Sequence, residues 1–202
     1  MGLLRRAALG LVVVVAAAAH DASASVSIAV PFDTLVSQST VAAFVTPVTQ
    51  TSAWQGGRIF TYTDVHIDQA VAGAALPEGI SVRTMGGDVG TVGQVVDGEA
   101  VLTVGRPSLL FLHPADAIPG DEGSGLTSHP ATYAVTARAQ GQFAVVADAA
   151  GELRVRRSSA VGALVAPRGA AVQVLAGDAL HGNKLNDARD AITRVWSRVH
   201  AP

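Results

Sequence analysis

Residues 58–71 read RIFTYTDVHIDQAV, and in this stretch apolar or β-branched residues alternate with polar ones. Side chains of a β-strand point to opposite faces in turn, so residues of one parity share a face. The stretch therefore predicts one long strand. Its core-facing side is expected to carry Thr61, Thr63, Val65 and Ile67. The opposite side, turned to solvent, then carries Tyr62, Asp64, His66 and Asp68.

The sequence on both sides of this strand predicts about seven short strands in all. Apolar or β-branched runs separated by turn signals occur at residues 40–48, 58–71, 80–85, 100–103, 108–112, 133–138, 142–146 and 153–156. In the run at 80–85, Ile80, Val82 and Thr84 share one face, and the run at 108–112, SLLFL, is apolar enough to be central in a sheet. Short strands at close spacing predict an all-β fold, either an OB-like barrel or a small β-sandwich.

The connections between these strands carry their own expectations. Pro47 is expected to end the first strand or to lie on an edge, and residues 51–57, TSAWQGG, then form a loop. Residues 139–141, AQG, are expected to close a hairpin, with Gly141 at the position that needs a positive φ. The glycine-rich residues 86–98 lack the Lys-Ser or Lys-Thr of a phosphate-binding loop, which favours a mobile hairpin or a bulged strand.

The carboxyl end changes character. Residues 158–182 are rich in Ala, Gly and Val without a clear period and predict an excursion from the fold. Residues 183–202 then predict an amphipathic helix packed on the barrel, capped by Asn183 or Asn186. Its apolar stripe consists of Leu185, Ala188, Ile192, Val195, Trp196 and Val199.

The amino terminus has the order of a secretory signal peptide over residues 1–24. Arg5 and Arg6 precede an uncharged apolar run at 7–19, and Ala22-Ser23-Ala24 is a small-x-small site for cleavage after Ala24. The apolar run of thirteen residues is too short to span the hydrocarbon core of a membrane. We therefore expect export to the periplasm or the extracellular space, a mature chain without a membrane span, and a barrel domain at residues 25–157.

Composition narrows the function classes. The formal net charge of −2 and the absence of a basic stripe argue against a nucleic-acid partner. The chain has no cysteine, no G-x-S-x-G and no H-E-x-x-H, so three common hydrolase signatures are missing. No cofactor is predicted. These observations favour an exported, non-catalytic binding or interaction module for an unknown protein or small-molecule partner.

One set of side chains supports an alternative function. Asp64, His66 and Asp68 alternate along one strand and share its polar face, where carboxylate oxygens and an imidazole nitrogen could bind a divalent metal. The alternative to the binding module is accordingly a secreted, metal-assisted enzyme that uses these three residues. A solvated strand face would give the same pattern, and we favour that interpretation.

Several of these segments together resemble the opening of netrin-like domains, which have an OB-type barrel. The similar segments are residues 35–48, 61–73, 80–82 and 105–112, within a region of about residues 35–157. The chain is also similar to uncharacterised exported bacterial proteins in which Gly-Gly precedes an apolar Leu-Leu-Phe-Leu strand. The animal modules carry cysteines, one of which binds protease zinc in the inhibitors of that family. Because this chain has no cysteine, the resemblance implies a fold but transfers no inhibitory residue.

Overall fold

The computed structural model describes residues 26–118, 131–166 and 174–201. The predicted signal peptide at residues 1–24 lies outside the described residues. Strands make up 48% and helices 19% of the described residues, so the prediction of a β-rich chain with a carboxyl-terminal helix is confirmed. The expectation of a single helix omits α1 Phe32–Ser37 and α2 Ala176–Leu180.

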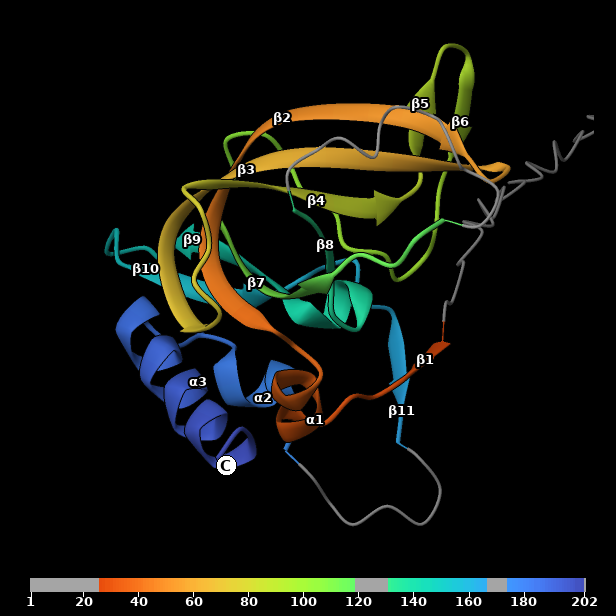
Figure 1. Ribbon diagram of the computed structural model, residues 1–202. Helices are drawn as coiled ribbons and strands as arrows, with labels where there is room; N and C mark the ends of the chain where they lie inside the picture. Colours follow the sequence, from red (N-terminus) through yellow and green to blue (C-terminus); the bar gives the residue numbers. More distant parts are fainter. Residues whose placement is uncertain (1–25, 119–130, 167–173, 202) are drawn as a thin grey trace, which may run out of the picture.

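Seven strands form one mixed sheet (Figure 1), in the order β10-β9-β7-β2-β3-β4-β8. Their bounds are β2 Val41–Gln55, β3 Arg58–Gly73, β4 Gly79–Met85, β7 Ser108–Pro114, β8 Thr132–Val135, β9 Gln142–Ala147 and β10 Leu153–Arg157. β8 also pairs with β7, so the hydrogen bonding of β2, β3, β4, β8 and β7 returns to its start; we call these five strands the strand ring. Within the ring only β4 and β8 run parallel.

The hairpin of β2 and β3 shows that the predicted loop at 51–57 was wrong. β2 continues to Gln55, and Gly56 and Gly57, with φ of 53° and 76°, form the two-residue turn. The ladder register shifts between Pro47 and Thr49, which leaves Val48 as an extra residue. Such a bulge accommodates a proline, which lacks an N–H group, so the strand can continue beyond it.

The two faces of β3 were assigned correctly except at one residue. Val65 is 2% and Thr63 0% exposed, whereas Asp64, His66 and Asp68 are exposed. Tyr62, expected on the solvent face, is buried, and its hydroxyl group donates to Oε1 of Gln55. A tyrosine ring can be buried where its hydroxyl group finds such an acceptor.

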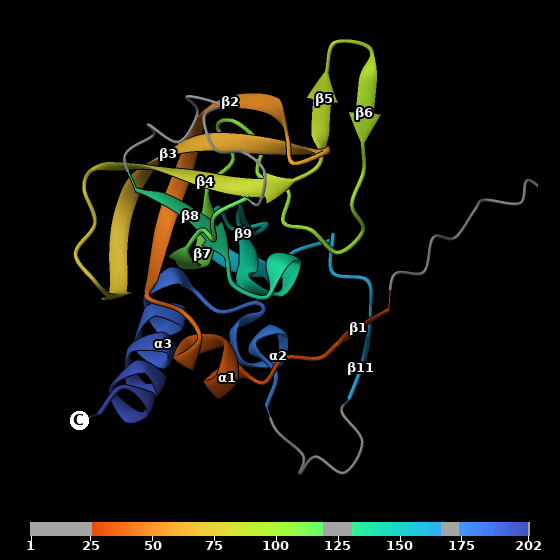
Figure 2. The same cartoon turned by 45° about the vertical axis from the view of Figure 1, so that its right-hand side comes forward.

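The segment between β4 and β7 contains the expected hairpin but not the expected strand. β5 Gly87–Val89 and β6 Val92–Gln94 pair in antiparallel fashion and project from the sheet (Figure 2). Residues 100–103 form no strand. There the side-chain amide of Gln142 bonds both the N–H and the carbonyl group of Val101, taking the place of a neighbouring backbone.

The predicted hairpin at 133–146 is also wrong. β8 pairs with β4 and β7, and a short 3₁₀-helix, η2 Arg138–Gly141, connects it to β9. The left-handed backbone falls on Ala137 and Arg138, each with φ of 55°, rather than on Gly141. The apolar strand at 108–112 is confirmed as central, because β7 lies between β2 and β9 with Leu109 to Leu112 fully buried.

Three helices lie together at the end of the molecule opposite the β5–β6 hairpin (Figures 1 and 2). They are α1 Phe32–Ser37, α2 Ala176–Leu180 and α3 Leu185–Val199. α3 confirms the predicted carboxyl-terminal helix, and its buried Ala188 and Ile192 belong to the same apolar cluster as Phe44, Phe111 and Phe143 of the sheet. No side chain caps α3; Asn183, a predicted cap, instead donates to the carbonyl group of Ala179.

Sequence reasoning missed two features of the remaining chain. α1 has six residues, too few to show a helical period. The predicted excursion contains α2 and β11 Ala163–Val165, and β11 pairs in parallel with β1 Val26–Ile28.

A second apolar cluster, distinct from the one under the helices, fills one end of the strand ring. Its members include Val41, Val45, Val65, Val82, Leu110 and Leu112.

Candidate functional site

Asp64, His66 and Asp68 lie on the exposed face of β3, but each has a separate neighbour. The Thr49 hydroxyl group donates to Asp64 Oδ2 at 2.9 Å, and the Thr46 hydroxyl group donates to Asp68 Oδ2 at 2.7 Å. His66 Nδ1 lies 3.9 Å from Glu78 Oε1. The carboxylates are thus bonded to threonines of the adjacent strand β2 rather than turned toward a common point.

No group of three His, Asp or Glu side chains suited to a metal ion occurs in the part of the chain that the structure describes. Asp64, His66 and Glu78 border a shallow hollow of about 500 Å³ together with Val48 and Ile80, and Asp68 lies outside it. The predicted metal ligands therefore share a face but not a coordination geometry.

A different cavity opens at the end of the strand ring beside the β5–β6 hairpin. Its volume is about 390 Å³, and its wall is formed by β2, β3, β4, the hairpin and residues 95–102. We call it the polar mouth because many of the side chains that line it carry hydroxyl, amide or carboxyl groups. These side chains include Gln50, Ser52, Thr61, Thr84, Gln94 and Glu99. Asp88 of β5 and the apolar Val95, Val101 and Leu102 also border it.

Strand register explains why polar side chains meet there. Gln50 and Ser52 on β2 stand opposite Thr63 and Thr61 on β3, and Thr61 in turn stands opposite Thr84 on β4. These positions continue the parity of Val65, Ile80 and Val82, whose side chains belong to the apolar cluster inside the ring. The interior of the ring is thus apolar at one end and carries hydroxyl and amide groups at the other.

Two hydroxyl groups of the polar mouth form a short chain of hydrogen bonds. The Thr61 hydroxyl group donates to the carbonyl oxygen of Gly86 at 2.7 Å, and it lies 2.8 Å from the Ser52 hydroxyl group. Because Thr61 has one proton to donate, Ser52 is the donor of the second bond. A Cβ at Gly87 would lie 2.2 Å from Thr61 Oγ1 and 2.5 Å from Ser52 Oγ, so only glycine fits beside these two hydroxyl groups.

Glu99 is the buried acidic group of the polar mouth, with 8% of its surface exposed. Its Oε1 accepts a bond from the N–H group of Ala100, and its Oε2 lies 3.7 Å from Nε of Arg138. Burial raises the pKa of the Glu99 carboxyl group, an effect that the hydrogen bonds to the backbone of Ala100 and Met85 and the Arg138 charge offset only in part. A buried acid with a raised pKa beside a cavity is a recognised mark of a functional site.

The backbone next to Glu99 is strained. Ala137 and Arg138 both adopt left-handed conformations, which cost an L-residue about 1 kcal/mol or more. The N–H group of Ala139 donates to the carbonyl oxygen of Gly98, which ties this strained segment to the residue before Glu99. The strained turn thereby holds the Arg138 guanidinium group beside the carboxylate.

Sequence reasoning did not identify the polar mouth. Its residues come from four separate stretches between Gln50 and Leu102, and only the register of β2, β3 and β4 brings them together. One signal was present: Thr61 and Thr63 occupy core-facing positions that an apolar core would fill with Val or Ile. Nothing in the sequence around Glu99 indicates that its side chain is buried.

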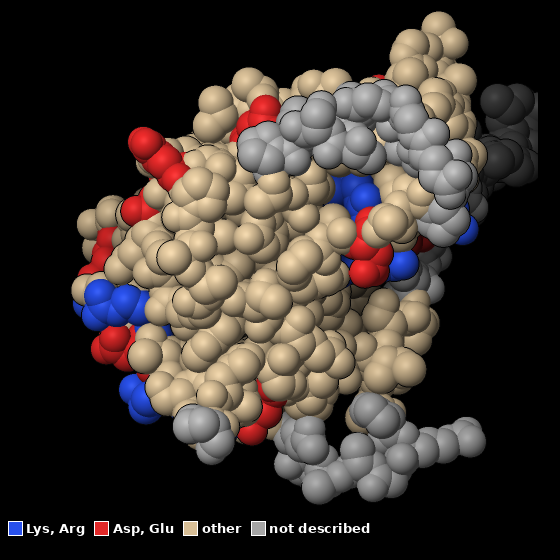
Figure 3. All heavy atoms as spheres, in the orientation of Figure 1, with Lys and Arg blue, Asp and Glu red and all other residues tan. Residues whose placement is uncertain are grey.

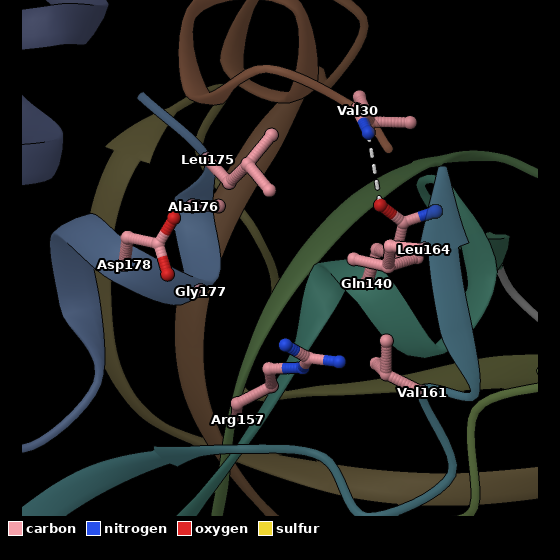
Figure 4. Close-up of a pocket in the computed structure, with 9 residues that line it drawn as sticks. All are labelled: Val30, Gln140, Arg157, Val161, Leu164, Leu175, Ala176, Gly177 and Asp178. Atoms are coloured by element: carbon pink, nitrogen blue, oxygen red, sulfur yellow. Dashed lines mark hydrogen bonds between the residues drawn. The ribbon is translucent and has the colours of Figure 1, made fainter. Parts of the chain in front are cut away.

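A smaller space lies between α2, η2 and β11 (Figure 4). The N–H group of Val30 donates to Gln140 Oε1 at 2.9 Å there, and Arg157 and Asp178 approach from two sides. Its volume of about 20 Å³ accommodates about one water molecule. The space is a packing gap between elements and too small for a ligand.

The surface drawn in Figure 3 is mostly uncharged, and its Lys, Arg, Asp and Glu side chains lie in small separate groups. This face therefore offers no broad basic area for a phosphate backbone. In the described ranges, no helix combines the length and apolarity that crossing a membrane requires. Comparisons of this chain with protein-family models, curated proteins and solved structures found no match.

Proposed function

We propose that this chain is an exported, non-catalytic binding module that holds a small polar ligand in the polar mouth. The observation that carries this proposal is the cavity of about 390 Å³ lined by converging hydroxyl, amide and carboxyl groups. Ligand pockets commonly have volumes of about 300–1,000 Å³, and mouths of β-barrels are frequent places for them.

The architecture of the strand ring supports an OB-type barrel as its description. Five strands, β2, β3, β4, β8 and β7, follow one another by hydrogen bonding, and the first three form an antiparallel meander. A single parallel pair, β4 with β8, and the antiparallel pair β7 with β2 complete the order. The helices pack on the outer face of this ring, against Phe44 and Phe111, whereas the polar mouth lies at one end of its interior.

Export belongs to the same proposal and rests on the charged, apolar and small-residue order of residues 1–24. Cleavage after Ala24 would leave Ser25 as the first residue, directly before β1, which begins at Val26. Mass spectrometry of the native protein from periplasmic and culture fractions tests this. Exported material that retains Met1 would contradict the assigned cleavage.

Ligand binding is tested by amide NMR spectra of the chain from Ser25 to Pro202. Three probes of different charge, glucose, agmatine and succinate, are added separately. We expect at least one of them to shift the amide signals of Ser52, Thr61 and residues 94–102, while the signals of α3 stay in place. No shift at the mouth with any of the three probes would refute the assignment of the ligand site.

A further inference from the structure

The hydrogen-bond donors in the floor of the polar mouth are already used within the protein. Ser52 donates to Thr61, and Thr61 donates to the carbonyl oxygen of Gly86. The side-chain N–H groups of Gln50 bond to Thr63 Oγ1 at 3.1 Å and to the carbonyl oxygen of Leu102 at 2.7 Å. These side chains therefore present oxygen lone pairs to a ligand rather than protons.

The remaining polar groups add mainly acceptors. Glu99 and Asp88 contribute carboxylates, and the Gln50 side-chain oxygen has no bonding partner among the described residues. The side-chain donors left to the site are the Thr84 hydroxyl group and the N–H groups of Gln94, whose side-chain oxygen accepts from the N–H group of Ile59. The side chains of this floor therefore favour a ligand that donates hydrogen bonds.

The charges around the cavity have one sign. Among the described residues that line it, Asp88 and Glu99 are charged and none is Lys or Arg. Arg138 approaches Glu99 from outside the lining, and its side chain is 54% exposed, so water screens its charge. Glu99 itself is buried, which makes its carboxylate the charge that gains most from a cation.

We propose that the polar mouth selects ligands with an ammonium or guanidinium group and that Glu99, assisted by Asp88, binds this group. This inference rests on the proposed function, since it concerns the same cavity. The apolar Val95, Val101 and Leu102 border the cavity, and Val95 and Val101 are 91% and 62% exposed. These side chains suit the aliphatic part of an alkyl amine or alkyl guanidine.

The test measures the affinity of agmatine, which carries a guanidinium and an ammonium group on a four-carbon chain, by calorimetry with the chain from Ser25 to Pro202. Glu99→Gln keeps the size of the side chain and removes its charge. We expect it to weaken agmatine binding by about ten- to hundredfold, the usual effect of a hydrogen bond to a charged group. The matched control is Glu78→Gln on the exposed face near His66, which should change the affinity less than about twofold because surface charges are screened.

A second variant covers the case in which Glu99→Gln fails to fold. Asp88 is exposed on the β5–β6 hairpin, so Asp88→Asn tests the same charge effect at a position outside the core. Equal agmatine affinity in wild type, Glu99→Gln and Asp88→Asn would refute the role of the carboxylates. Binding of glucose or succinate in the mouth without agmatine would refute the cation inference and leave the proposed function standing. Failure of all three probes would remove the proposed function itself.

Discussion

Replacement of Ile192 by alanine tests whether α3 is part of the folded core. Ile192 lies in the middle of α3 with no exposed surface and packs in the cluster that contains Phe44, Phe111 and Phe143. The change removes three carbon atoms, worth about 2.4 kcal/mol at ~0.8 kcal/mol per methylene, and leaves a cavity that the neighbours fill only in part. We expect a loss of about 3–4 kcal/mol in the free energy of unfolding, within the range measured for such truncations.

Urea unfolding followed by tryptophan fluorescence and circular dichroism measures this loss. For a chain of this length about 3 kcal/mol corresponds to roughly 6–12 °C in melting temperature, and to about 1–3 M in the urea midpoint. The control is Thr193→Ala, the next residue, which is exposed and donates to the carbonyl oxygen of Arg189 within α3. Its effect should stay within about 0.5 kcal/mol. Equal midpoints for the two variants would refute the packing of α3 on the sheet.

Three further predictions concern the strands and the acidic groups. Val65→Asp should lower the free energy of unfolding by several kcal/mol, because Val65 is 2% exposed and a buried carboxylate would lack a partner. Thr51→Asp, at an exposed position of β2, should lower it by less than about 1 kcal/mol. Equal denaturation midpoints for the two variants would contradict the assigned face of β3. Burial raises the pKa of Glu99, so the contribution of Glu99 to stability falls as pH rises above 4.5, the ordinary value of a glutamate. The melting temperature of Glu99→Gln minus that of the wild type should therefore increase between pH 4 and pH 8, and a constant difference would speak against the shift. Replacing Asp64, His66 and Asp68 together by serine should change the free energy of unfolding by about 1 kcal/mol or less. Zn²⁺ should stabilise neither the wild type nor this triple variant. A Zn²⁺-dependent rise in melting temperature confined to the wild type would restore the metal-site hypothesis.

Local patterns were sufficient where a single element carries its own signal. The period of two in β3 identified the buried Val65 and the exposed Asp64, His66 and Asp68, because alternation along a strand depends on backbone geometry alone. The apolar run 108–112 identified the central strand β7, and the stripe through Ala188 and Ile192 identified α3. In each case the residues that bury an element are neighbours within that element.

Patterns failed where a distant partner sets the backbone. Pro47 was expected to end the strand or to lie on an edge; β2 instead continues to Gln55, and at Pro47 it pairs with β3 but no longer with β7, so only the edge alternative holds. The segment 139–141 looked like a hairpin turn, but β8 pairs with β4 and β7, and strain falls on Ala137 and Arg138 instead. Residues 100–103 are held by the side chain of Gln142, forty-one positions away from Val101. Such pairings depend on competition between strands across the whole chain, which no local window contains.

The sequence by itself therefore determined a β-rich chain with a carboxyl-terminal helix, and it marked Thr61 and Thr63 as polar residues at core-facing positions. Only the tertiary structure decided what those positions face. The register of β2, β3 and β4 sets Ser52, Thr61 and Thr84 side by side, and the return of residues 95–102 across the ring end brings Glu99 to them. The physical reason is that period and propensity are local properties of the chain, whereas a cavity and the burial of a carboxylate are properties of surfaces that meet only when the ring closes.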